Sequence, residues 1–184
     1  MKLRHLPNFI SILRILLVIP LVFLLMQQRY VEAFAIYAVA AASDALDGYL
    51  ARRNAWTSAL GGILDPIGDK LLLVSTYVCL ALLELLPLWL AALVVLRDLV
   101  IVSGAAAFYF LVGRYEMAPS LASKLNTVFQ LALPALVLLE RTILSVPPSV
   151  ISALVAAVTL TTLLSGGHYV WHWGRKARAA ARGG

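Results

Sequence analysis

The chain has 184 residues, of which 62% are hydrophobic and only 13% charged, and its mean hydropathy is +0.91. This composition excludes an ordinary soluble domain and predicts an integral membrane protein, whose length fits one domain over residues 1–184. The net charge of +6 therefore indicates membrane topology and contact with anionic lipid headgroups rather than binding of nucleic acid. The single cysteine, Cys79, excludes an intramolecular disulfide.

Six apolar stretches are each close to the roughly 20 residues that a membrane helix needs. The first begins after Lys2 and Arg4 and imitates a signal peptide, but it contains Arg14 and lacks a small-residue cleavage site, so we expect a membrane helix there. The short lead before it leaves no room for a transit peptide, which favours a bacterial inner membrane. The expected fold is all-α, with six transmembrane helices over residues 7–27, 31–52, 64–86, 88–112, 124–141 and 148–172 and a basic tail from about 174.

Basic residues are distributed unequally between the two sides of this six-helix arrangement. Only Arg29 and Arg141 fall on one side. The positive-inside rule then predicts that both termini are cytoplasmic and that a polar active-site cavity opens on the cytoplasmic side. The residues on the more basic side are Lys2, Arg4, Arg52, Arg53, Arg114, Lys124, Arg175, Lys176, Arg178 and Arg182.

Four of the nine acidic residues fall between positions 44 and 69. Asp44 and Asp47 are three residues apart and Asp65 and Asp69 four apart, so each pair shares a face if its segment is helical. Four carboxylates beside a membrane repel one another unless cations neutralise them. Hard divalent cations that prefer oxygen ligands, Mg²⁺ or Mn²⁺, are the natural partners.

Glycines and an arginine beside these aspartates indicate a phosphate-bearing substrate. Gly48 allows close approach to the backbone, and Arg52 follows one turn later on nearly the same face, where a guanidinium suits a phosphate oxygen. Gly61 and Gly62 are expected in the polar connection before the second pair. Carboxylates that hold two metals beside an arginine suggest phosphoryl-type transfer from a diphosphate.

The segment reads Asp-x2-Asp-Gly-x2-Ala-Arg-x8-Gly-x3-Asp-x3-Asp and resembles the signature of the CDP-alcohol phosphotransferase family. The resemblance implies a homodimer of six-helix subunits that transfers a phosphoalcohol group from a CDP-alcohol and releases CMP. It implies metal ligation by Asp44, Asp47, Asp65 and Asp69, with Asp69 also the general base. The positions that it associates with the CDP moiety are Gly48, Arg52, Ser58 and Gly61.

Further stretches are similar to the CMP-forming cardiolipin synthases of this family, which join CDP-diacylglycerol to phosphatidylglycerol. They are 96–99, 119–130 and 168–176. Phosphatidylglycerophosphate synthases, which use glycerol 3-phosphate, are the rival reading; they typically have Arg-Glu where this chain has Arg97-Asp98. The signature offers no serine, cysteine or histidine as a covalent nucleophile, so we expect direct displacement.

Isolated polar residues in the apolar segments have two readings. The first is a structural ion pair with the neighbour in the chain, Lys70 with Asp69 and Arg97 with Asp98. Because neighbours on a helix do not face each other, the second is that Arg14 and Arg97 form an anion-binding cavity. Arg97, Lys124, Arg114 and Arg14 are therefore predicted to bind the acceptor.

Asn8 and Ser11 are either helix caps or contacts to the nucleotide. His168 and His172 fit a membrane-interface position better than a metal site.

An ion-coupled transporter also uses buried carboxylates, but it does not explain the spacing of Gly48, Arg52 and Gly61. A non-catalytic scaffold does not explain why all four aspartates are intact.

Overall fold

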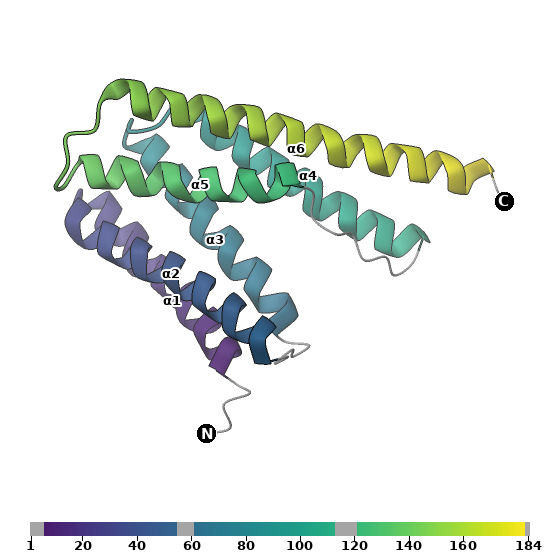
Figure 1. The fold of residues 1–184 in the computed structure, drawn as a ribbon, viewed down its shortest axis with the longest axis horizontal. Coiled ribbons are helices and arrows are strands. Elements are labelled where there is room, and N and C mark those ends of the chain that lie inside the picture. Colours follow the sequence, from purple (N-terminus) through teal and green to yellow (C-terminus); the bar gives the residue numbers. More distant parts are fainter. Residues whose placement is uncertain (1–5, 55–60, 113–120, 183–184) are drawn as a thin grey trace.

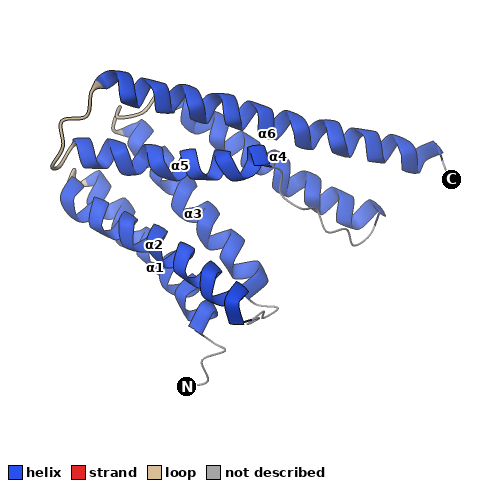
Figure 2. Cartoon of the chain, viewed as in Figure 1, coloured by secondary structure: helices blue, strands red, loops and turns tan. Residues whose placement is uncertain are grey.

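The protein, described here from a computed structural model, forms a bundle of helices (Figures 1 and 2). The backbone is described for residues 6–54, 61–112 and 121–182, and the side chains for 12–43, 68–104, 121–167 and 169. Within these ranges there are six helices and no strand. They are α1 (Leu6–Met26), α2 (Tyr30–Asn54), α3 (Gly61–Leu82), α4 (Leu88–Val112), α5 (Leu121–Glu140) and α6 (Pro148–Arg182).

The observed helices confirm the predicted order and correct several boundaries. α3 ends at Leu82, where the apolar run predicted continuation to 86, and α6 continues to Arg182 through the predicted basic tail. Gly61 and Gly62, expected in a connection, are the first residues of α3. Hydropathy misplaced the end of α3 because an apolar turn and an apolar helix have the same composition, and the end of α6 because a helix can continue through a basic segment.

Tight turns reverse the chain at the end of α1 and the end of α3. Gln28 and Glu84 have φ angles of 58° and 57°, in the left-handed region. Beyond each of them a backbone N–H bonds back to a carbonyl of the last helical turn, from Arg29 to Leu24 at 2.9 Å and from Leu85 to Leu80 at 2.9 Å. This is the Schellman pattern of a helix C-terminus, formed here without glycine.

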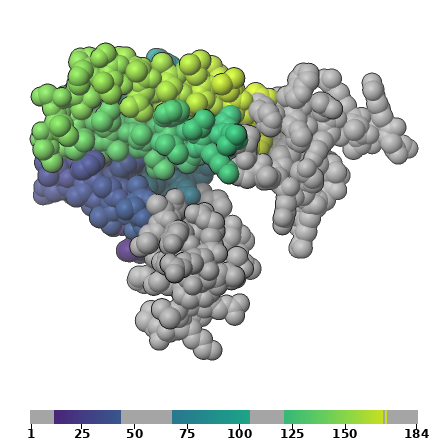
Figure 3. All heavy atoms as spheres, viewed as in Figure 1, coloured from purple at the N-terminus to yellow at the C-terminus, as the bar shows by residue number. Residues whose placement is uncertain are grey.

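The helices pack in two groups that are joined through α3 and α5. α1 lies along α2 and α3, whereas α6 lies along α4 and α5; further contacts join α2 to α5, and α3 to α4 and α5. The two groups diverge toward the N-terminus of α1 and the C-terminus of α6 (Figure 1). In the space-filling view, α5 and α6 form a continuous surface beside α1 and α2 (Figure 3).

A tyrosine from the other group compensates for a proline inside α5, and a second tyrosine bonds to the next carbonyl. Pro134 has no N–H, so the carbonyl of Gln130 loses its helical partner. The Tyr77 hydroxyl donates to that carbonyl at 3.2 Å, and the Tyr37 hydroxyl donates to the next carbonyl, of Leu131, at 2.9 Å. Both tyrosines are buried, so these bonds fix α5 against α2 and α3.

The bundle has an apolar outside and a partly polar inside. Large apolar side chains such as Ile19, Phe23 and Leu164 are more than 60% exposed, whereas several polar side chains are almost fully buried. Among the described residues, two segments are long and apolar enough to cross a membrane, 121–140 and 148–167, and two shorter apolar stretches cover 12–26 and 30–43. The buried polar residues are Arg14, Thr76, Arg97, Asp98, Asn126, Gln130, Thr162 and Ser165.

Candidate active site

The two pairs of aspartates lie on consecutive helices, as their spacing predicted. Asp44 and Asp47 belong to α2, and Asp65 and Asp69 belong to α3. Of the four, Asp69 alone has a described side chain. The other predicted residues whose side chains lie outside the described set are Asn8, Ser11, Gly48, Arg52, Ser58, Gly61 and Arg114.

Asp69 forms an ion pair with Arg14, which brings two predicted site residues together from α1 and α3. The Arg14 side chain is fully buried, while that of Asp69 is 41% exposed. Asp69 also lines a small cavity of about 30 Å³ with Leu72, Leu73 and Thr127, to which Ala41 and Leu131 contribute. The carboxylate thus faces a space bounded by α2, α3 and α5.

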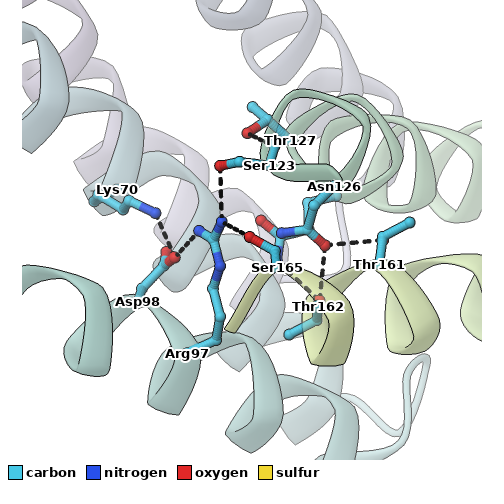
Figure 4. Close-up of polar contacts among 10 residues, drawn as sticks. Lys70, Arg97, Asp98, Ser123, Asn126, Thr127, Thr161, Thr162 and Ser165 are labelled. Carbon is cyan, nitrogen blue, oxygen red and sulfur yellow. Dashed lines mark hydrogen bonds and ion pairs between the residues drawn. The ribbon is translucent and has the colours of Figure 1, made fainter. Parts of the chain in front are cut away.

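A second charged group begins one residue further along α3. Lys70 forms an ion pair with Oδ1 of Asp98 on α4, and Nη1 of Arg97 donates to the same oxygen at 2.7 Å (Figure 4). Of the two readings of Arg97, the ion pair with its neighbour Asp98 is therefore observed. Lys70 instead pairs with Asp98 on another helix.

Two serines from other helices hold the guanidinium of Arg97. Its Nη2 donates to Oγ of Ser165 at 2.7 Å and to Oγ of Ser123 at 3.1 Å, so α4 is linked to α6 and α5 (Figure 4). A Cβ added at Gly166 would lie 3.7 Å from Cγ of Arg97, an ordinary van der Waals distance. The two serine hydrogen bonds fix the position of Arg97 in the interior.

The α5–α6 interface holds a polar network that the sequence did not predict. Oδ1 of Asn126 accepts from the hydroxyls of Thr161 at 3.0 Å and Thr162 at 2.8 Å, and the Gln130 amide donates to Thr162 at 3.4 Å. The only sequence signal was that polar residues recur within two apolar helices. Their positions in the chain, 35 and 36 residues apart, follow no local motif.

The remaining candidates stand apart from these groups. Lys124 is exposed on α5, next to Ser123 in the chain. The side chains of His168 and His172 lie outside the described set, so their predicted interface position is untested. Among the described side chains, no three of His, Cys, Asp and Glu form a metal cluster.

The four aspartates fit hard divalent cations by the chemistry of their donors. Carboxylate oxygens are the ligands that Mg²⁺ and Mn²⁺ prefer. The members of each pair are three or four residues apart on one observed helix, which places each pair on one helical face. The side chain of Asp69, with its 41% exposure, is accessible to an ion.

A bundle with an apolar exterior and buried ion pairs has the character of a membrane protein with an internal polar site. The model of the CDP-alcohol phosphatidyltransferase family matches residues 4–165, and the chain belongs to this family. Its members are membrane-associated. This membership agrees with the resemblance carried by residues 44–69 and favours an enzyme over a transporter.

Curated relatives in this family differ in the lipid product that their names specify. The CMP-forming cardiolipin synthase of Rattus norvegicus is 30% identical, with 96% of this chain and 64% of that protein covered. Its counterpart in Homo sapiens is 31% identical, with 92% and 62% covered. A probable phosphatidylglycerophosphate synthase of Mycobacterium tuberculosis is 33% identical, with 92% and 81% covered. The chain thus spans slightly under two thirds of these cardiolipin synthases.

Proposed function

We propose that this protein transfers a phosphatidyl group from CDP-diacylglycerol to a hydroxyl of phosphatidylglycerol, giving cardiolipin and CMP. Family membership and the similarity to the two cardiolipin synthases support this reading. The observation that carries it is a connection from the signature to a buried cation. Asp69 is followed in the sequence by Lys70, and ion pairs with Asp98 link Lys70 to Arg97.

On the donor side, the helix boundaries favour convergence of the four aspartates. α2 ends at Asn54 and α3 begins at Gly61. At 1.5 Å per residue, Asp44 lies about 15 Å before the end of α2 and Asp69 about 12 Å after the start of α3. Two antiparallel helices joined by a short connection therefore carry these carboxylates at similar depth.

The donor site is completed by residues that match the family signature. Divalent cations held by Asp44, Asp47, Asp65 and Asp69, as Mg²⁺ or Mn²⁺, would offset charge on the diphosphate and the leaving CMP. The residues proposed to contact the CDP moiety are Asn8, Ser11, Gly48, Arg52, Ser58 and Gly61.

Asp69 is proposed to take the proton of the attacking hydroxyl. Its ion pair with the buried Arg14 orients the carboxylate, which also lines the small cavity between α2, α3 and α5. The attacking oxygen forms a bond to the lipid-side phosphorus while the bond to CMP breaks, and the hydroxyl proton passes to Asp69. No covalent enzyme intermediate is required.

The acceptor site is assigned to the charged group on α3 and α4. Lys70 and Arg97 are two cations that share the one carboxylate of Asp98, so the trio carries a formal charge of +1. Burial of an uncompensated charge is costly, and a phosphate oxygen of the acceptor would neutralise it. Lys124, Arg114 and Arg14 are the further cations proposed for this substrate.

Glycerol 3-phosphate is the alternative acceptor, favoured by the M. tuberculosis relative, of which a larger share is covered. Both acceptors carry a phosphate and a primary hydroxyl. The decisive experiment supplies the purified full chain with CDP-diacylglycerol and either alcohol, and identifies the lipid product by mass. Cardiolipin from the first mixture supports the proposal; phosphatidylglycerophosphate from the second alone overturns it.

Metal dependence is tested in the same assay. A chelator should stop the release of CMP, and Mg²⁺ or Mn²⁺ should restore it.

We further propose a homodimer in a bacterial inner membrane with both termini cytoplasmic. Modification of single cysteines introduced at the two termini, in inside-out and right-side-out vesicles, tests that topology, with Cys79 replaced beforehand.

A further inference from the structure

The ion pair between Arg97 and Asp98 leaves one donor and one acceptor unused. Nε of Arg97 and Oδ2 of Asp98 are buried and have no hydrogen-bond partner in the part of the chain that the structure describes. The two residues are 7% and 4% exposed. An unsatisfied buried polar atom is unfavourable, so both atoms call for a ligand.

All the other strong contacts of the pair serve to hold it in place. Asp98 uses Oδ1 for both Lys70 and Arg97, and Arg97 uses Nη1 for Asp98 and Nη2 for the hydroxyls of Ser123 and Ser165. The guanidinium and the carboxylate are thus fixed from four helices. Their unused atoms lie within several ångströms of each other, because Nη1 and Oδ1 already join the two groups.

A ligand that satisfies both atoms must offer an acceptor to Nε and a donor to Oδ2. A phosphate oxygen is the preferred acceptor for a guanidinium, and a hydroxyl is the natural donor to a carboxylate. A glycerol phosphate ester carries both groups on a three-carbon unit. It also has a second hydroxyl, which remains free to react.

We propose that Arg97 and Asp98 form a subsite for a glycerol phosphate ester, in which Nε of Arg97 binds a phosphate oxygen and Oδ2 of Asp98 binds the secondary hydroxyl. This inference rests on the proposed function and refines it. Phosphatidylglycerol and glycerol 3-phosphate share the glycerol phosphate unit. The subsite thus selects the headgroup whichever of the two is the acceptor.

The test removes the secondary hydroxyl from the acceptor and the carboxylate from the enzyme in turn. The purified full chain is assayed with CDP-diacylglycerol and two acceptor pairs: phosphatidylglycerol against phosphatidyl-1,3-propanediol, and glycerol 3-phosphate against 3-hydroxypropyl phosphate. Each deoxy compound keeps the reacting primary hydroxyl. The pair that yields lipid product identifies which ester is the acceptor.

We expect kcat/KM of the wild-type enzyme to fall about tenfold to a hundredfold when the secondary hydroxyl is missing, because a buried carboxylate oxygen then stays unpaired. In Asp98→Asn and Asp98→Ala this preference should shrink to about threefold or less. KM for CDP-diacylglycerol should change little. Ser165→Ala is the matched control. It loosens Arg97 but leaves Asp98 in place for the secondary hydroxyl of the acceptor, so it should lower kcat/KM equally for both members of a pair.

Two results overturn the subsite: equal use of both members of a pair by the wild type, or an undiminished preference in the Asp98 variants. The first comparison needs no variant, so it stands even if the substituted proteins do not fold. Failure of the proposed function is distinguishable. In that case the wild type binds CDP-diacylglycerol but converts none of the four acceptors, and the subsite falls with it.

Discussion

The two groups of helices carry polar residues in two different ways. In α1–α3 the aspartates recur at three and four residues within single helices, and the described member, Asp69, meets its partner Arg14 across one interface. In α4–α6 most of the buried polar side chains find their partners on other helices. There the group forms only when the helices pack, through contacts such as Arg97 with Ser123 and Ser165.

We propose that this difference separates the chemistry of transfer from the recognition of the acceptor. Repeated carboxylates on one helical face suit the binding of ions, which need several identical ligands close together. Polar residues contributed by several helices suit the binding of a particular alcohol, because they can surround it from different sides. We therefore expect substitutions of the aspartates in α2 and α3 to lower turnover for every acceptor, and substitutions of the buried polar residues in α4–α6 to affect acceptor choice or stability.

The largest expected effect is that of Asp69→Asn. Loss of the proposed base should reduce kcat by about a hundredfold to ten-thousandfold for every acceptor. Binding of CDP-diacylglycerol, measured by equilibrium dialysis of labelled donor, should remain detectable. Glu32→Gln is the control, since Glu32 is an exposed carboxylate paired with Arg29 at the other end of α2. Retained turnover in Asp69→Asn would remove the base from the mechanism.

A smaller effect, on stability alone, is expected at the α5–α6 network. Asn126→Ala leaves the buried hydroxyl of Thr162 without its described acceptor and opens a gap, so the free energy of unfolding should fall by about 2–3 kcal/mol. Denaturant unfolding in detergent measures this. Thr159→Val should cost much less, because among the described residues that hydroxyl bonds within its own helix, to the Val155 carbonyl. A change in acceptor preference in Asn126→Ala would place the network in the acceptor site instead.

The Tyr77 hydroxyl, at the junction between the two groups, should contribute about 1 kcal/mol to the free energy of unfolding. Tyr77→Phe removes the donor to the Gln130 carbonyl, which Pro134 leaves without a helical partner. In a Pro134→Ala background the carbonyl regains a backbone N–H, so the same substitution should cost clearly less. Equal costs in both backgrounds would show that the tyrosine does not compensate for the proline.

The sequence allowed the helices and the placement of the two aspartate pairs on α2 and α3 to be predicted, and the reason is periodicity. Apolar runs gave the six helices to within a few residues except at Leu82 and Arg182, where composition carries no signal for a turn or for continuation. The aspartate pairs were visible because both members share one helix. The contact of Lys70 with Asp98 was not, because it joins residues on different helices and depends on how those helices pack.

The smallest expected effect lies at the turn after α3, far from both groups of site residues in the chain. Glu84 has a φ angle of 57°, which costs a residue with a Cβ about 1 kcal/mol relative to glycine. Glu84→Gly should therefore raise the free energy of unfolding by about 0.5 kcal/mol, once the greater freedom of glycine in the unfolded chain is subtracted. Glu84→Ala separates the two changes in this substitution, because it removes the exposed carboxylate but keeps the Cβ. An equal gain in both variants would mean that charge, and not backbone conformation, limits this turn.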